Sequence, residues 1–278
     1  MPAAALLLAL LSAVSSAVWN LLVKQSSDTA AVTAVAVAIG VVLFSPSLAF
    51  GRVPAAAWPF IGASAALELG YMVLLATAYR RAELSLVFPL ARGLAPVLVL
   101  LIGLVALHTS ASAGELAGVL LVAVGAVAVR GIRLAGGFAD TGIALLIAVC
   151  IAGYTLVDKR GVSLASPAAY LEVVMALLAL PYLAFVASRS KDGLQSLRRE
   201  LRPRTAFISI GIIGGYDLVL YGLRLAAAAP VAAVRESSVV IGTALAAIVL
   251  RERVGPARFC GACLVAAGVT VLAFAAGS

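Results

Sequence analysis

Five ionisable side chains lie inside otherwise apolar stretches of this sequence: Glu68, Arg92, Asp217, Arg235 and Glu236. An ionisable group in such surroundings is costly unless it is paired or hydrated, so each is a candidate for function. An arginine can hold a carboxylate or phosphoryl group through two parallel hydrogen bonds, and a carboxylate can hold an ammonium group or a proton. The five residues therefore predict a polar cavity that binds a charged small molecule.

A purely structural alternative remains open. Glu68 would then pair with Arg92, and Asp217 with Arg235, to hold helices together. Three acids against two arginines leave one acid without an arginine, however, and such an acid is a candidate to carry a proton. Glu68 is the first candidate for this role, and Asp217 is the second.

Polar and aromatic groups accompany these charges within the apolar stretches. Four of them are expected at a depth away from the membrane surfaces: Tyr71, Tyr216, Trp19 and Asn20. Such side chains either pack helices together or contact an organic substrate. We include them among the candidate substrate-binding residues.

Other groups with chemical potential have simpler explanations. Glu115 and Glu172 fall in the first turns of apolar segments, where the helix dipole stabilises an acid. His108, at the end of a segment, is expected to be solvated. The three cysteines lie in apolar segments, so neither a disulfide framework nor a metal site is predicted. HExxH, GxSxG and Walker motifs are missing from the sequence, so we expect no enzyme, no metal and no cofactor.

The composition identifies the environment of these residues. Hydrophobic residues make up 64% of the chain and charged residues 12%, and the mean hydropathy is +1.15. A soluble domain has roughly 25% charged residues. The chain is therefore expected to be a multi-pass protein in a lipid bilayer. Its net charge of +8 is placed largely in loops, so nucleic-acid binding is not predicted.

The apolar segments have the length that crosses a hydrocarbon core of about 30 Å. The first segment has no basic residue before it, so we expect a retained helix and not a secretory signal. Pro89 and Pro96 fall inside the fourth segment and predict a kink or a broken hydrogen-bond ladder there. Ten spans are predicted, near residues 3–23, 30–50, 56–78, 84–107, 114–130, 140–158, 168–187, 205–224, 230–250 and 258–276.

The sequence also repeats itself. WNLLVK at residues 19–24 is echoed by YTLVDK at 154–159, and Gly70-Tyr71 recurs as Gly215-Tyr216. We expect two repeats, residues 1–134 and 135–278, with five spans each. An odd number of spans inverts the second repeat in the membrane, an arrangement that places a central site at the repeat interface in secondary transporters. The predicted fold is therefore an all-α bundle of ten transmembrane helices, built from two inverted five-helix repeats around a central cavity.

Loop charges predict the orientation. Most lysines and arginines outside the spans fall in odd-numbered connections, above all in residues 188–204. The positive-inside rule then puts these connections in the cytoplasm and both termini on the far side. The spacings Gly114-x-x-x-Gly118 and Gly211-x-x-x-Gly215 favour close helix crossing.

Several motifs resemble a known family. Ala78-Tyr79 followed by residues 84–96 (LSLVFPLARGLAP) is similar to the third and fourth helices of EamA domains, from the drug/metabolite transporter superfamily. Residues 230–238 (PVAAVRESS), 250–254 (LRERV) and 261–272 resemble the end of a second EamA domain. One departure is visible: His108 stands where the family often has an acid, whereas Glu252 keeps it in the second half.

The resemblance implies a bacterial ten-helix transporter whose cavity is lined mainly by the third, fourth, eighth and ninth helices. It also implies export or exchange of small metabolites across the cell inner membrane. Because both signs of charge occur in the expected cavity, we favour an amino-acid-like cargo, with protons as a candidate coupling ion. An exporter of cationic drugs and a non-transporting membrane scaffold are the alternatives, and the protein is expected to be a monomer or a homodimer.

Overall fold

The computed structural model describes residues 1–80, 84–130, 138–189, 192–249 and 255–275. Every regular element in these ranges is a helix, so the expected all-α fold is confirmed for that part of the chain. The predicted motif at residues 250–254, including Glu252, lies outside the described residues.

The helices follow the predicted segments closely. In the first half they are α1 (Ala3–Lys24), α2 (Thr29–Phe44), α3 (Ser47–Phe50), the 3-10 turn η1 (Ala55–Ala57), α4 (Trp58–Arg80), α5 (Leu84–Val105) and α6 (Ala113–Arg130). In the second half they are α7 (Phe138–Leu164), α8 (Pro167–Ser188), α9 (Gly193–Arg199), α10 (Pro203–Leu225), α11 (Ala228–Arg235), α12 (Ser238–Val249) and α13 (Pro256–Phe274).

Seven helical segments among the described residues are long and apolar enough to cross a membrane: Ala3–Lys24, Ala55–Ala78, Thr141–Leu164, Pro167–Ser188, Pro203–Leu225, Ala228–Leu245 and Pro256–Phe274. Three shorter apolar helices accompany them, Thr29–Phe44, Ala91–Val105 and Ala113–Val129. The chain is therefore a membrane protein with several spanning helices.

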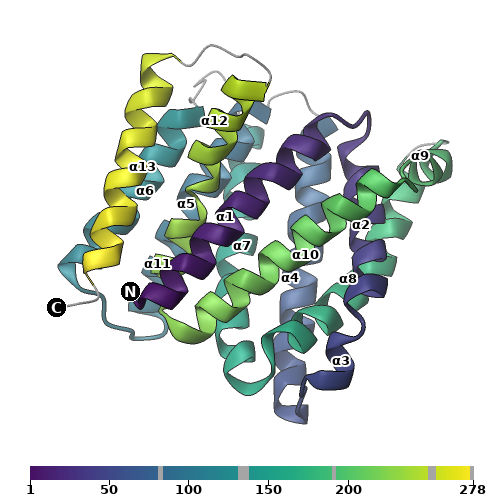
Figure 1. The fold of residues 1–278 in the computed structure, drawn as a ribbon, viewed down its shortest axis with the longest axis horizontal. Coiled ribbons are helices and arrows are strands. Elements are labelled where there is room, and N and C mark those ends of the chain that lie inside the picture. Colours follow the sequence, from purple (N-terminus) through teal and green to yellow (C-terminus); the bar gives the residue numbers. More distant parts are fainter. Residues whose placement is uncertain (81–83, 131–137, 190–191, 250–254, 276–278) are drawn as a thin grey trace.

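The helices form one bundle, in which segments distant in sequence lie side by side. In Figure 1, α1 crosses the front of the molecule beside α10, α13 packs on α6 at one side, and α2, α8 and α9 gather at the opposite side. The N-terminal amino group donates to the Leu272 carbonyl at 3.3 Å, which ties the start of α1 to the end of α13.

Small residues allow these helices to approach closely. Ala5, Ala9, Ala13 and Ala17 recur every four residues on α1, and all four are buried. The same helix packs on the predicted Gly211-x-x-x-Gly215 motif, where the Ser15 hydroxyl donates to a carbonyl of α10. Without a hydrophobic force between helices inside lipid, such packing is a main source of their association.

The contact between α6 and α13 is a glycine seam, formed by Gly118, Gly125, Gly261 and Gly268. A Cβ atom added to Gly261 would lie 2.5 Å from the Val129 nitrogen and 2.7 Å from the Gly125 carbonyl oxygen. The Gly268 carbonyl oxygen would lie 3.1 Å from a Cβ atom added to Gly118. The two backbones therefore touch directly, and the predicted close crossing at Gly118 is confirmed.

The structure corrects two details of the predicted spans. The ninth span is interrupted, since Glu236 and Ser237 form a buried turn between α11 and α12. α5 continues through Pro89 and Pro96, and the kink expected at these prolines stays a prediction. In addition, the helix predicted over 140–158 continues to Leu164 as α7, so residues near 158 lie inside it.

Candidate functional site

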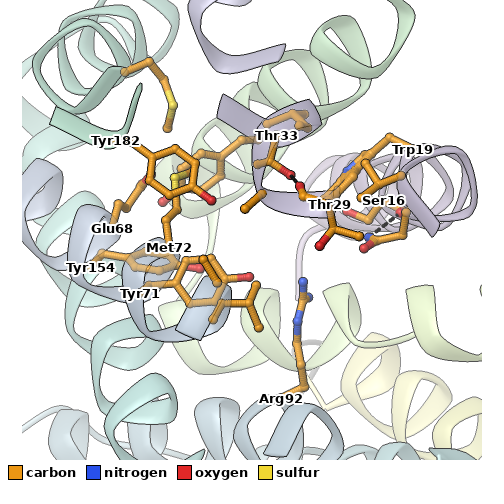
Figure 2. A pocket seen from close by; sticks show the side chains of 18 of the residues that line it. Ser16, Trp19, Thr29, Thr33, Glu68, Tyr71, Met72, Arg92, Tyr154 and Tyr182 are labelled. Atoms are coloured by element: carbon orange, nitrogen blue, oxygen red, sulfur yellow. Dashed lines mark hydrogen bonds between the residues drawn. The ribbon is translucent and has the colours of Figure 1, made fainter. Parts of the chain in front are cut away.

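A cavity opens in the middle of the bundle, with about 960 Å³ of empty space that includes its open mouth. Eight helices contribute to its wall: α1, α2, α4, α5, α7, α8, α10 and α11. The resemblance predicted a wall formed mainly by α4, α5, α10 and the ninth span, so α1 and α2 contribute more than expected. In Figure 2, Glu68, Tyr71 and Tyr154 lie on one side of the cavity and Trp19 on the other, while Arg92 extends its guanidinium group between them.

Seven of the nine predicted site residues line this cavity: Trp19, Asn20, Glu68, Tyr71, Arg92, Tyr216 and Arg235. They come from α1, α4, α5, α10 and α11, so residues from both halves of the sequence meet at one place. Asp217 and Glu236 are not among the lining residues of the described chain. Glu236 lies behind the wall, in contact with Arg92.

Arg92 and Glu236 form a buried ion pair across the two halves of the chain. The Arg92 Nη1 atom lies 3.4 Å from the Glu236 Oε1 atom, with both side chains less than a tenth exposed. The acid sits at the turn that separates α11 from α12. The arginine of α5 therefore neutralises a carboxylate at a helix interruption, and neither of the two pairings considered from the sequence, Glu68 with Arg92 or Asp217 with Arg235, is the one that forms here.

A second cluster surrounds Asp158, a residue that the sequence analysis did not select. The Tyr170 hydroxyl donates to Asp158 Oδ1 at 2.9 Å, and the Tyr216 hydroxyl donates to Asp158 Oδ2. Asp158 is 1% exposed and Glu68 is 4% exposed. The two carboxylates lie within electrostatic range of each other. The hydrogen bonds to the Asp158 carboxylate come from hydroxyl groups.

Glu68 is the buried acid that lines the cavity. Its Oε1 atom has no hydrogen-bond partner among the described residues. Tyr216 and Arg235 lie near enough to interact with it, and its side chain faces the cavity. A buried carboxylate oxygen with an open hydrogen-bonding position, beside a cavity, can accept a proton or an ammonium group.

Three tyrosines and an arginine form a row along one wall. The ring centroids of Tyr71 and Tyr154 are 6.2 Å apart, and those of Tyr154 and Tyr216 are 6.0 Å apart. Both pairs are edge-to-face, the favoured arrangement for aromatic rings. The Arg235 guanidinium carbon lies 5.2 Å from the Tyr216 centroid, within the range of a cation–π contact.

Asp217 lies next to a further acid and outside the cavity wall. Glu172 of α8 is 1% exposed and is close enough to Asp217 of α10 for the two carboxylates to interact. Each has one buried oxygen without a hydrogen-bond partner among the described residues. Glu172 was expected near the membrane surface as a dipole-stabilised acid. Because it is packed between helices, the structure does not support that simple explanation.

The sequence analysis did not select two ionisable residues of α7, for identifiable reasons. Asp158 was assigned to the end of a predicted span, and the six further residues of α7 carry the helix past it. A signal was present, since Asp158 follows Tyr154 by four residues and shares its helix face. Lys159, noted in the repeated motif, donates to the Leu223 and Ala226 carbonyls at 2.6 and 2.8 Å and so caps the end of α10.

Comparisons with known proteins concern the family and the fold of this chain. Residues 141–274 match the EamA-like transporter family. A solved crystal structure, described as that of a protein, superposes with a TM-score of 0.72 at 18% identity and covers 96% of this chain and 94% of its own. At that identity the likeness concerns the fold alone. Curated proteins give no significant match.

The matched residues fall within the predicted second repeat, 135–278, and include α10, α11 and the acid at the helix interruption. Proteins of this family are transporters and generally not enzymes. Residues 141–274 are therefore identified as an EamA-like transporter domain, of the drug/metabolite transporter superfamily.

Proposed function

We propose that this protein is a secondary transporter that exports or exchanges a small polar metabolite, amino-acid-like in its charges, by alternating access. The observation that carries this proposal is the central cavity, whose wall holds two arginines, a carboxylate and a row of tyrosines. A zwitterion needs both signs of charge within one small volume. This wall offers both.

The architecture that we propose for this activity is ten transmembrane helices in two inverted five-helix repeats, in the cell inner membrane. Seven long apolar helices and three shorter ones among the described residues are compatible with this number. Discontinuous helices are typical of substrate sites in transporters built from inverted repeats. The buried interruption between α11 and α12, one residue after Arg235, fits that pattern.

The cavity residues suggest separate roles. Arg235 is only partly buried and faces the cavity, so it is the arginine placed to meet an anionic group of the cargo. Arg92 already contacts Glu236, and a cargo carboxylate would join or displace that pair. Glu68 would hold the amine of the cargo or a coupling proton. Trp19, Asn20 and Tyr71 would contact the rest of the molecule.

Transport of labelled amino acids from proteoliposomes, with and without a pH gradient, tests this proposal. The key comparison is between the native protein and Glu68→Gln, which keeps the shape of the side chain and removes its charge. We expect native flux to respond to the gradient and the variant to lose that response. Glu115→Gln is the matched control, because Glu115 exchanges hydrogen bonds with Ser112 at the start of α6, away from the cavity, and glutamine can keep them.

If the native protein moves no amino acid, the proposal of an amino-acid-like cargo is wrong. Flux unaffected by Glu68→Gln and by the gradient would keep a transporter but remove proton coupling through Glu68. Absence of flux for every charged metabolite tested would favour the scaffold alternative.

An exporter of organic cations is the second candidate. The row formed by Tyr71, Tyr154 and Tyr216 beside Glu68 favours it, because aromatic faces and a carboxylate together bind quaternary ammonium groups. The same vesicles loaded with a labelled quaternary ammonium compound distinguish the two cargoes. Efflux of that compound that is blocked by Glu68→Gln and insensitive to amino acids would select the cation exporter.

A further inference from the structure

A second hollow, on the outside of the bundle, shares no lining residue with the central cavity. It is an apolar groove between α2, α8 and the short helix α9, with about 890 Å³ of empty space including its open side. Val35, Ile39 and Val42 of α2 form one wall, and Leu194, Leu197 and Leu201 form the other. Leu194 and Leu201 are about two-thirds exposed, at 65% and 66%.

The groove runs along α2 and so extends into the depth of the membrane. Its lining residues on α2 span residues 35–43, which corresponds to about 12 Å at 1.5 Å per residue. α9 covers only one end of it, where α8 ends at Ser188 and the chain turns into α9. In Figure 1, α9 projects from the bundle near the start of α2 and the end of α8.

A polar pocket adjoins that covered end. It is lined by Val32, one turn before Val35 on α2, and by Arg202, which directly follows Leu201. The groove and the polar pocket therefore adjoin, because α2 and the segment after α9 contribute lining residues to both. Arg199 and Arg204 also line the pocket, and Glu200 is the single acid among its lining residues.

The polar pocket is held in place by hydrogen bonds. The Arg204 Nη2 atom donates to the Leu22 carbonyl and, at 3.3 Å, to Gln25 Oε1, which joins the start of α10 to the end of α1. The Thr205 hydroxyl donates to the Glu200 carbonyl at 2.6 Å. The buried Arg204 Nε has no hydrogen-bond partner among the residues that the structure describes. The pocket therefore has three arginines against one acid, and the N–H group at Arg204 Nε is available to donate a hydrogen bond to a ligand.

We propose that this groove and pocket together bind one anionic phospholipid, with an acyl chain along α2 and the phosphate group against Arg199 and Arg202. Phosphate oxygens accept paired hydrogen bonds from guanidinium groups, and basic pockets at the ends of membrane helices suit acidic head groups. An apolar groove alone would accept any lipid tail. The adjoining arginines select for negative charge. This site is independent of the proposed transport activity.

Native mass spectrometry of the delipidated protein tests the proposal, with equimolar phosphatidylglycerol and phosphatidylcholine of identical acyl chains. We expect one phosphatidylglycerol to remain bound at several-fold higher occupancy than phosphatidylcholine. Arg199→Gln combined with Arg202→Gln should abolish that preference. Arg52→Gln combined with Arg160→Gln is the matched control, because it removes the same charge from exposed positions near the other end of α8.

Ala38→Phe supplies a second test that leaves the arginines intact. Ala38 lines the groove on α2, so the added ring should lower the occupancy of both lipids at once. Inorganic phosphate, added against chloride at equal ionic strength, should leave the bound lipid in place. Equal binding of the two lipids, or unchanged occupancy in both variants, would overturn the proposal. Displacement of the lipid by phosphate would show that the pocket binds a free anion instead.

Discussion

Two buried acids, Glu236 and Asp158, are satisfied in different ways. Glu236 meets a guanidinium group, that of Arg92 at 3.4 Å. Asp158 meets two phenol hydroxyls, those of Tyr170 and Tyr216. The first is an ion pair, whereas the hydrogen-bond donors to Asp158 are neutral hydroxyl groups.

The difference predicts that one cluster contributes mainly to stability and the other mainly to transport. A buried ion pair is expensive to break from one side, because the remaining charge has no compensation. Carboxylates held by hydroxyl groups can gain or lose a proton without leaving an opposite charge stranded. We therefore expect the Arg92–Glu236 pair to matter most for stability and the acids beside Tyr216 to matter most for transport.

The largest effect should come from Arg92→Leu, which leaves Glu236 buried without its partner. Loss of one member of a buried ion pair costs about 3–5 kcal/mol, and we expect that loss in the free energy of unfolding measured in detergent. The double variant Arg92→Met with Glu236→Leu should recover most of it. A single variant that unfolds within about 1 kcal/mol of the native protein would contradict the ion-pair role.

Tyr216→Phe should have the next largest effect, because it removes a hydroxyl that donates to Asp158. A hydrogen bond to a charged group contributes about 1.5–3 kcal/mol. The loss should shrink when Asp158→Asn is also present, since both changes remove the same interaction. Additive losses in that double-mutant cycle would show that the hydroxyl and the carboxylate are not coupled.

Lys159→Met tests an ammonium group whose hydrogen bonds go to backbone carbonyls and not to a side chain. The lysine is half-buried and donates to the carbonyls of Leu223 and Ala226 at the end of α10. We expect a loss of about 1–2 kcal/mol, because two hydrogen bonds disappear but water reaches part of the site. Lys159→Arg should retain more stability than Lys159→Met, and equal losses would argue against the capping role.

Glu68→Gln should have the smallest effect on stability, within about 0.5 kcal/mol of the native protein. The change removes a like charge beside Asp158 and keeps the shape of the side chain. Thermal unfolding of the variant measures this. A large destabilisation would mean that Glu68 holds the helices together, and its effect on flux could then not be assigned to cargo or protons.

The helical fold was predictable, because apolar segments of membrane length are a strong signal in a chain with few charges. Nearly all predicted segments correspond to helices. The site was predictable in part: Glu68, Arg92 and Arg235 were found because charges are rare in apolar segments. Their meeting at one cavity could be anticipated from the repeated Gly-Tyr pairs, and the family match supports the resemblance found in the motifs.

The partners of these charges could not be predicted. Pairing depends on how helices rotate about their axes, and the sequence of one helix does not fix its rotation against another. Arg92 of α5 accordingly pairs with Glu236, between α11 and α12. Asp158 lies inside α7 and not at the predicted end of its segment. The interruption between α11 and α12 was equally hidden, because no proline or glycine marks it.

The glycine seam between α6 and α13 has a consequence for how the molecule is assembled during synthesis. α13 is the last helix that the structure describes, so α6 emerges from the ribosome long before its closest neighbour exists. Until then its glycine face, which exposes backbone to lipid, has no partner. The first half of the chain therefore enters the bilayer with this face of α6 unpaired, and the face is covered only after α13 has been synthesised.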